Sequence, residues 1–159
     1  MRSFGSSKSA TGDHVPWSII ETTADMGLRI EDTVSWPETI EHAIHGLQTF
    51  ALISESDIQP RPSESIRILR TGSGEIIDFE RDLVRVLDEI VYRNDVQDEW
   101  IVRVEVSMDE VSYTISPHVI DASEVVRSVE VKAITRHGLC VKPPNEATGM
   151  WYAQVILDL

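Results

Sequence analysis

The alternation of apolar and polar positions divides the chain into short strands and two amphipathic helices. Residues 26–30 alternate in the period-two pattern of a strand with one buried face. The same alternation in residues 101–106 and 111–115 predicts an antiparallel hairpin, which Pro117 is expected to end. Shorter apolar runs complete the predicted strands at residues 17–20, 66–69, 129–135, 139–141 and 150–157.

Two further segments repeat apolar residues every three or four positions, which predicts helices. Ser35, followed three residues later by Glu38, forms a capping box at the start of the first helix. The second helix is predicted over about residues 78–92. We interpret the remaining polar positions as solvated outer faces: Glu41, His42 and His45 on the first helix, and Glu80, Arg81, Asp82, Arg85, Asp88 and Glu89 on the second.

This order of elements predicts a single α+β domain, in which a mainly antiparallel or mixed sheet carries two amphipathic helices packed on it. The length of 159 residues is typical of one domain. The first residues are rich in serine and glycine, so residues 1–16 are predicted to be a flexible tail and residues 17–159 the folded domain.

Composition narrows the classes of function. The content of 42% hydrophobic and 26% charged residues is typical of folded proteins. The net charge of −13 disfavours direct binding to nucleic acid and suits a basic protein partner or a cation. The single Cys140 excludes an intrachain disulfide and fits a reducing compartment. Neither a signal peptide nor a membrane-spanning run is found, so the expected location is the cytoplasm and no membrane partner is expected.

Acidic residues near the two ends are the candidates for chemistry. Asp25 precedes a predicted buried strand, and Asp158 lies beside the terminal carboxylate of Leu159. Residue types alone favour structural roles, with Asp25 satisfying a turn and Asp158 ending a strand. If the two acids meet in space, their oxygen ligands suit Ca²⁺, Mg²⁺ or Mn²⁺ rather than zinc.

A second candidate is the polar strand at residues 132–137. Alternation places Ala133, Thr135 and His137 on one face, and Lys132 and Arg136 on the other. His137 is either a half-buried structural histidine or a functional group. Residues 136–138 are expected to form a break or bulge.

These segments resemble the archease family. The family has a His-Thr-Ala-Asp segment near its amino terminus, a Lys-Ala-x-Thr-x-His strand and an acidic dipeptide at its carboxyl end. The counterparts here are Thr22-Thr23-Ala24-Asp25, Lys132-Ala133-Ile134-Thr135-Arg136-His137 and Asp158-Leu159. The resemblance covers about residues 20–159. Thr22 stands where the family usually has histidine.

The resemblance implies that this protein is not itself an enzyme. Archeases are small protein cofactors of the RtcB-type RNA ligase, which acts in tRNA splicing and RNA repair. They promote guanylylation of that ligase from GTP and allow repeated turnover. By resemblance, Asp25, Asp158 and the Leu159 backbone carbonyl would bind a divalent metal, Ca²⁺ in structures, with Mg²⁺ or Mn²⁺ as alternatives. Thr22, Lys132 and His137 would lie near the site or contact the ligase.

Two other functions stay open at this point. One is a metal-dependent phosphoester hydrolase that uses Asp25 and Asp158, with His137 as its base. The other is a chaperone-like binding module with no metal role. We prefer the ligase-activating role because no group of residues in the sequence resembles a complete catalytic site.

Overall fold

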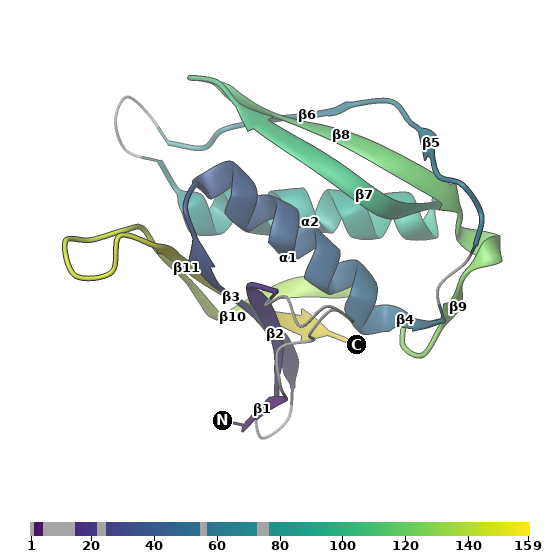
Figure 1. Cartoon of the computed structure of the whole chain (residues 1–159), viewed down its shortest axis with the longest axis horizontal. Helices are drawn as coiled ribbons and strands as arrows, with labels where there is room; N and C mark the ends of the chain where they lie inside the picture. The colour runs from purple at the N-terminus through teal and green to yellow at the C-terminus, as the bar shows by residue number, and fades with distance from the viewer. Residues whose placement is uncertain (1, 5–14, 22–24, 55–56, 73–76) are drawn as a thin grey trace.

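The computed structural model describes residues 2–4, 15–21, 25–54, 57–72 and 77–159, and it confirms the predicted α+β class (Figure 1). The first half of the chain forms β1 (Arg2–Phe4), β2 (Trp17–Glu21), β3 (Met26–Thr33), α1 (Trp36–Ala51), β4 (Leu52–Ser54), β5 (Arg61–Pro62) and β6 (Ile66–Leu69). The second half forms α2 (Phe79–Asp95), β7 (Glu99–Met108), β8 (Ser112–Asp121), a 3-10 turn (Ala122–Glu124), β9 (Val126–Arg127), β10 (Ala133–Lys142) and β11 (Trp151–Asp158).

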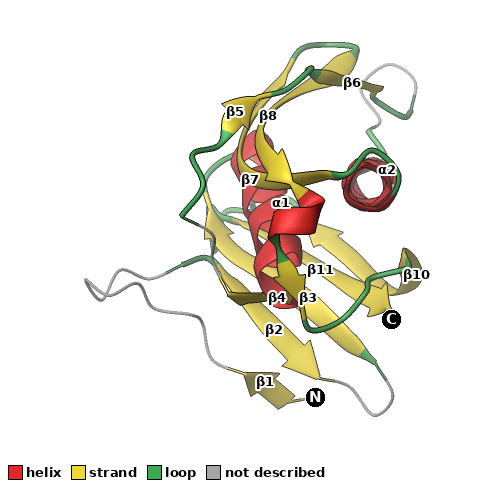
Figure 2. Ribbon diagram, turned by 90° about the vertical axis from the view of Figure 1, so that its right-hand side faces the viewer, coloured by secondary structure: helices red, strands yellow, loops and turns green. Residues whose placement is uncertain are grey.

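The two helices lie between two sheets (Figures 1 and 2). One sheet has five strands in the order β1-β2-β3-β11-β10. The other has β5 and β6 on one side of β8 and β7 on its other side, and β4 pairs with β9 separately. Every described strand pair is antiparallel. The prediction of a single sheet is therefore replaced by a sandwich, because apolar residues on both sides of each helix need cover.

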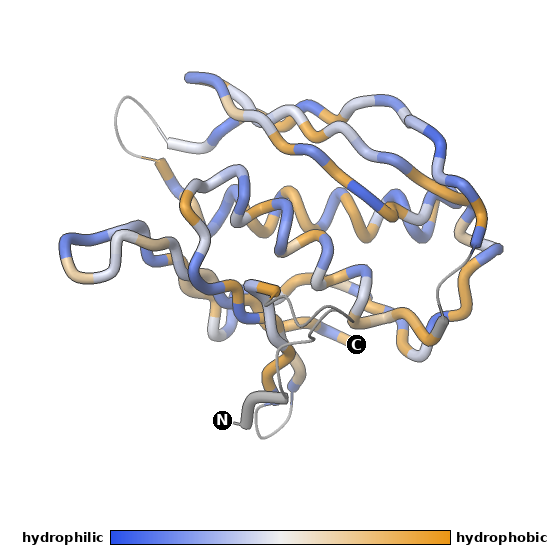
Figure 3. The backbone as a smooth tube through the Cα atoms, viewed as in Figure 1, coloured by the Kyte–Doolittle hydropathy of each residue, from blue (hydrophilic) through white to orange (hydrophobic). Residues whose placement is uncertain are grey.

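The helices begin where the sequence predicts. The Ser35 hydroxyl accepts the Glu38 N–H at 3.2 Å, and the Glu38 carboxylate accepts the Val34 N–H at 2.8 Å. The Asp78 carboxylate accepts the Arg81 N–H at 3.0 Å and so caps α2. Figure 3 shows apolar positions recurring along both helices between polar ones. No described helix is long and apolar enough to cross a membrane.

Part of the predicted tail is a strand. Arg2–Phe4 pairs with β2 as β1, and the partly buried Val15 packs against the core. The other residues of the tail, 1 and 5–14, lie outside the described residues. The flexibility of that segment stays a prediction.

Pro117 does not end the hairpin as predicted, because β8 continues to Asp121. The Pro117 carbonyl accepts the Ser63 N–H at 3.1 Å, on the side of β8 that faces β5 and β6. The missing proline N–H would point to the same side, where residues 63–65 separate the two short strands. No hydrogen bond of a strand ladder is lost there, so proline is tolerated inside this strand.

Helix side chains bond to the open edges of the strands beside them. On β7, Glu41 of α1 accepts the Val106 N–H at 2.8 Å, and Gln48 donates to the Ile101 carbonyl at 3.1 Å. Along α2, the edge partners are Arg85 to the Leu69 carbonyl of β6, and Asp88 and Glu80 to the Ile134 and Val141 N–H groups of β10. Glu41 is thus a structural partner of β7, and its prediction as a solvated residue was wrong.

Asp82 is also not on a solvated face, since it is fully buried. Its carboxylate accepts the Thr71 N–H at 2.9 Å and the Tyr113 hydroxyl at 2.6 Å. The Trp36 indole N–H in turn donates to the Tyr113 oxygen at 3.0 Å. The network joins α1, α2 and β8 through the core, because each buried polar group needs a partner.

Tyr113 makes the stability of the fold depend on pH. Burial, together with the hydrogen bond to Asp82, raises the pKa of Tyr113 above the ordinary value of 10.0. Above pH ~10 the unfolded chain ionises this tyrosine while the folded chain keeps it protonated, so stability falls as pH rises. We expect Tyr113→Phe to be less stable than wild type near pH 8 but to lose less further stability between about pH 8 and pH 11. Urea unfolding at both pH values measures the free energy of unfolding. Tyr92→Phe, at an exposed tyrosine, is the control and should lose as much stability between the two pH values as wild type.

Candidate metal centre

The strand register brings the two candidate acids to one end of the five-stranded sheet. In the β11–β3 pair, Ile156 lies opposite Gly27 and Leu157 opposite Met26. Continuing this register by one residue places Asp158 opposite Asp25. Residues opposite each other on antiparallel strands have Cα atoms about 4.5–5.5 Å apart. The two carboxylates therefore belong to residues whose Cα atoms are neighbours.

Alternation along β11 decides which face these acids occupy. Val155 and Leu157 belong to the core between the sheets, so Ile156 and Asp158 point to the face that is turned away from the helices. Asp25 shares this outer face with Gly27 because the two are two residues apart. Both Asp25 and Asp158 are exposed to solvent, as a site open to a partner requires.

Two glycines bring the backbone close to Ile156 beside the acids. A Cβ atom on Gly27 would lie 2.4 Å from the Val155 carbonyl oxygen and 2.8 Å from the Ile156 Cδ1. A Cβ on Gly138 would lie 2.9 Å from the Ile156 Cγ1, and Gly138 has a φ of 72°. Gly27 was not predicted to be a site residue, although a glycine inside a strand is a known sign of close backbone approach.

On its other side, β11 pairs with β10, which carries His137 and begins one residue after Lys132. Asp158 lies opposite Ala133, and its carbonyl accepts the Lys132 N–H at 2.8 Å. Thr135 lies opposite Ile156, hence on the same outer face as Asp158. The register shifts between Thr135 and Cys140, which confirms the predicted break.

His137 lies in this bulge and is exposed, so it is not a half-buried structural histidine. Its N–H donates to the Thr135 hydroxyl at 3.2 Å. The side chain of Gln154 fixes the bulge by donating to the Gly138 carbonyl at 3.0 Å. Thr22, the remaining candidate, lies outside the described residues.

The donor set at this end of the sheet suits a hard cation but does not complete its coordination. Carboxylate oxygens of Asp25 and Asp158, with an oxygen of the exposed Leu159, are ligands that Ca²⁺ prefers, and Ca²⁺ takes about six to eight of them. Within the residues that the structure describes, no cluster of three or more His, Cys, Asp and Glu side chains could hold a metal. Water or a partner protein would have to supply the other ligands.

Fold and site together define a small acidic α+β protein with paired carboxylates at one end of its largest sheet. A sequence profile of the Archease protein family (MTH1598/TM1083) matches residues 17–159, so the chain belongs to the archease family. No match was found among curated protein sequences.

The fold also matches a solved structure, the solution structure of Methanobacterium thermoautotrophicum protein 1598. The TM-score is 0.63, the sequence identity is 21%, and the match covers 91% of this chain and 99% of the other. At this identity the likeness concerns the fold.

Proposed function

We propose that this protein is a metal-binding cofactor of an RtcB-type RNA ligase, which promotes guanylylation of the ligase and its repeated turnover in cytoplasmic tRNA splicing or RNA repair. The protein itself is then not the ligase. Membership of the archease family supports the general role. The observation that carries the metal part is the register that sets Asp158 opposite Asp25 on the outer face of the sheet.

The protein would supply only part of the oxygen ligands that a bound divalent cation needs. Two exposed carboxylates on adjacent strands attract a divalent cation, and the same exposure leaves its other positions accessible. Asp25 and Asp158 hold the ion, the Leu159 oxygen adds a ligand, and the bound metal supplies positive charge beside the ligase's reacting phosphates. His137 lies on the neighbouring strand β10 and Lys132 directly before it, and both are exposed to a docked partner.

Charge supports a protein partner rather than RNA. With a net charge of −13, this chain is repelled by phosphate backbones and attracted to a basic RNA-binding ligase. The attraction raises the rate of encounter, and it weakens as salt is added. In this proposal the ligase alone holds the RNA.

The direct test is to mix this protein with the ligase of the same organism, GTP and a divalent metal, and to follow guanylylated ligase over many turnovers. Asp25→Asn and Asp158→Asn keep the size of each side chain and remove its charge. We expect each to lower Ca²⁺ affinity and stimulation of the ligase at least about tenfold, since each takes away a charged ligand.

Glu110→Gln makes the same change of charge at an exposed position next to β8, in the other sheet, and should behave as wild type. Full stimulation by both aspartate variants would refute the metal role. Hydrolysis of a phosphoester by the protein without the ligase, lost in His137→Ala, would favour the hydrolase instead. Stimulation that needs no metal would favour a chaperone-like module.

A further inference from the structure

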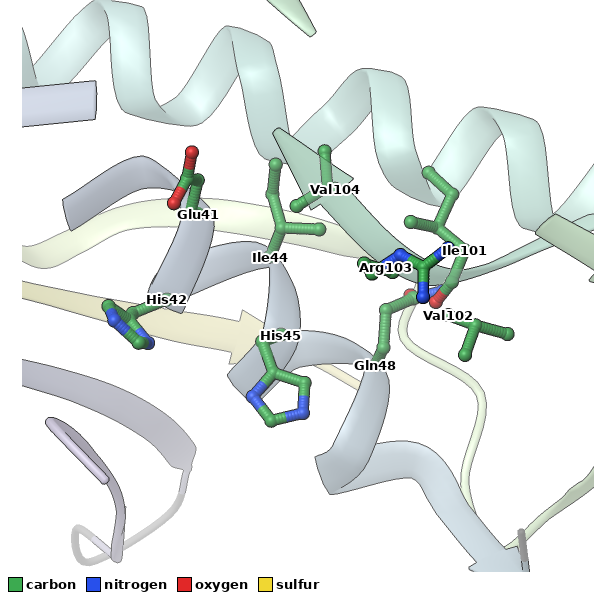
Figure 4. Close-up of a pocket in the computed structure, with 9 residues that line it drawn as sticks. All are labelled: Glu41, His42, Ile44, His45, Gln48, Ile101, Val102, Arg103 and Val104. Atoms are coloured by element: carbon green, nitrogen blue, oxygen red, sulfur yellow. The ribbon is translucent and has the colours of Figure 1, made fainter. Parts of the chain in front are cut away.

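A groove runs between α1 and the edge of β7, away from the paired acids of the five-stranded sheet. It consists of two adjoining cavities of about 240 Å³ and 190 Å³, which share His45, Gln48, Ile101 and Val102 as walls. Figure 4 shows the first cavity, in which Ile44 and Gln48 of α1 extend toward the β7 side chains, while His42 and His45 point away from them. Together the cavities are as large as a small-molecule site. We call this feature the α1–β7 groove.

The two ends of the groove differ in chemistry. The residues that line only the first cavity include the titratable Glu41, His42 and Arg103, together with the apolar Ile44 and Val104. The second cavity extends toward the end of α1. The residues that line only this cavity are Thr49 and four apolar side chains: Leu52, Trp100, Ile120 and Val125. His42 and His45 were predicted to lie on a solvated face. His45 is exposed and His42 partly exposed, and both also line this groove. A ligand that fills the whole groove would therefore place a charged group beside Arg103 in the first cavity and an apolar part beside these four side chains in the second.

The backbone of β7 offers a hydrogen-bond donor in the first cavity of the groove. The Val106 N–H and the Ile101 carbonyl point toward α1, because Glu41 and Gln48 bond to them. Val104 lies two residues before Val106 and opposite Pro117 of β8, so its N–H also points toward α1. Among the described residues, no side chain accepts from this N–H. It is the kind of strand-edge amide that a ligand can bind.

The charges near this amide favour an anion. Arg103 is exposed and forms no ion pair with any described residue, although the chain as a whole carries a net charge of −13. Two carboxylates of α1 have partners of their own, since Glu41 accepts the Val106 N–H and Glu38 lies 3.8 Å from the His42 ring, whereas Glu105, two residues along β7, is exposed to solvent. Trp17 donates to the His45 Nδ1 at 3.3 Å, which leaves the proton of a neutral His45 ring on Nε2.

We propose that the α1–β7 groove binds a small amphipathic anion. The carboxylate, phosphate or sulfonate head accepts the Val104 N–H and pairs with the Arg103 guanidinium, while the apolar tail packs against Trp100, Ile120 and Val125. A backbone N–H together with a guanidinium binds an anionic head with charge-assisted hydrogen bonds. The groove is separate from the proposed metal site and does not depend on it.

The probe for this test is 8-anilinonaphthalene-1-sulfonate, an aromatic sulfonate whose fluorescence rises in apolar surroundings. Titration into the full chain should give saturable binding at one site, with the Val104 amide signal shifting in two-dimensional NMR spectra. N-phenyl-1-naphthylamine is the same molecule without the sulfonate, so it should bind at least about tenfold more weakly.

Two variants locate the site. Arg103→Glu should weaken binding of the sulfonate at least about tenfold, with little effect on the neutral analogue. Arg67→Glu makes an equal change of charge at an exposed residue of β6 and should leave the affinity for the sulfonate unchanged. Val102→Trp adds bulk at a residue that is 43% exposed and lines both cavities, and should block both probes. Circular dichroism checks that each variant is folded. Equal affinity for the two probes, or wild-type affinity in Arg103→Glu or Val102→Trp, would overturn the proposal.

Discussion

Replacing Asp82 with alanine is expected to lower the free energy of unfolding by about 3 kcal/mol or more. The change leaves the Thr71 N–H and the Tyr113 hydroxyl without their acceptor in the core, where Tyr113 is fully buried. A buried donor without a partner costs about 1–3 kcal/mol, and the lost side chain adds a cavity. Urea unfolding at pH 7 measures the effect.

The neighbouring Arg81→Ala serves as the control, because Arg81 lies on the same turn of α2 and is exposed. We expect it to change stability by less than about 0.5 kcal/mol.

Asp82→Asn tests the two hydrogen bonds separately. Its amide oxygen can accept the Thr71 N–H, but its NH₂ group cannot accept the Tyr113 hydroxyl, so an intermediate loss is expected. Equal stability of Asp82→Ala and Arg81→Ala would show that the network contributes little.

A methyl group on Gly27 should be the most damaging small change in the five-stranded sheet. Its Cβ would lie 2.4 Å from the Val155 carbonyl oxygen, so β3 and β11 have to separate. We expect Gly27→Ala to destabilise the protein by about 3 kcal/mol, at the upper end of overpacking effects. Asp25 lies directly before β3 and Asp158 is the last residue of β11, so separating these strands should also lower the Ca²⁺ affinity, which calorimetric titration measures.

Gly149→Ala separates the steric effect from backbone strain. Gly149 has a φ of 62°, but a Cβ there has no atom within 4 Å. Strain alone costs about 1–2 kcal/mol, and Ca²⁺ affinity should stay at the wild-type value. If Gly27→Ala binds Ca²⁺ as tightly as wild type, the close approach of the strands does not position the acids.

Local patterns in the sequence predict most of the elements because the physics that sets them is local. The bonds of Ser35 and Asp78 to N–H groups three residues ahead start the helices, and residues 26–30 alternate because one face of β3 is buried. Such patterns do not predict which element packs against each apolar face. The helices pack between two sheets, an arrangement that depends on contacts between distant parts of the chain.

The errors at Asp82 and Pro117 have the same origin. Asp82 lies three residues after Phe79 and four before Val86, so helical spacing already places it at the edge of the apolar stripe. Its charge suggested a solvated position, and only the fold supplies Thr71 and Tyr113 as partners. Likewise, Pro117 suggests the end of a strand until the gap between β5 and β6 is known.

The sequence predicts which residues form the candidate site but not how they lie in space. Asp25 and Asp158 are separated by most of the chain, and nothing local indicates that their strands are neighbours. The register of β3 against β11 supplies that fact. The α1–β7 groove was missed altogether, because His42 and His45 fit a solvated helix face as well as they fit a cavity wall.

The helix side chains that bond to strand edges have a consequence for how this protein behaves at high concentration. Glu41 and Gln48 on β7, Arg85 on β6, and Glu80 and Asp88 on β10 occupy edge groups that could otherwise template the strand of a second molecule. At the edges of β6, β7 and β10, intermolecular sheet growth, the first step toward fibrils, must displace these bonds before it begins. Solubility is thus protected by the same helices that fill the core.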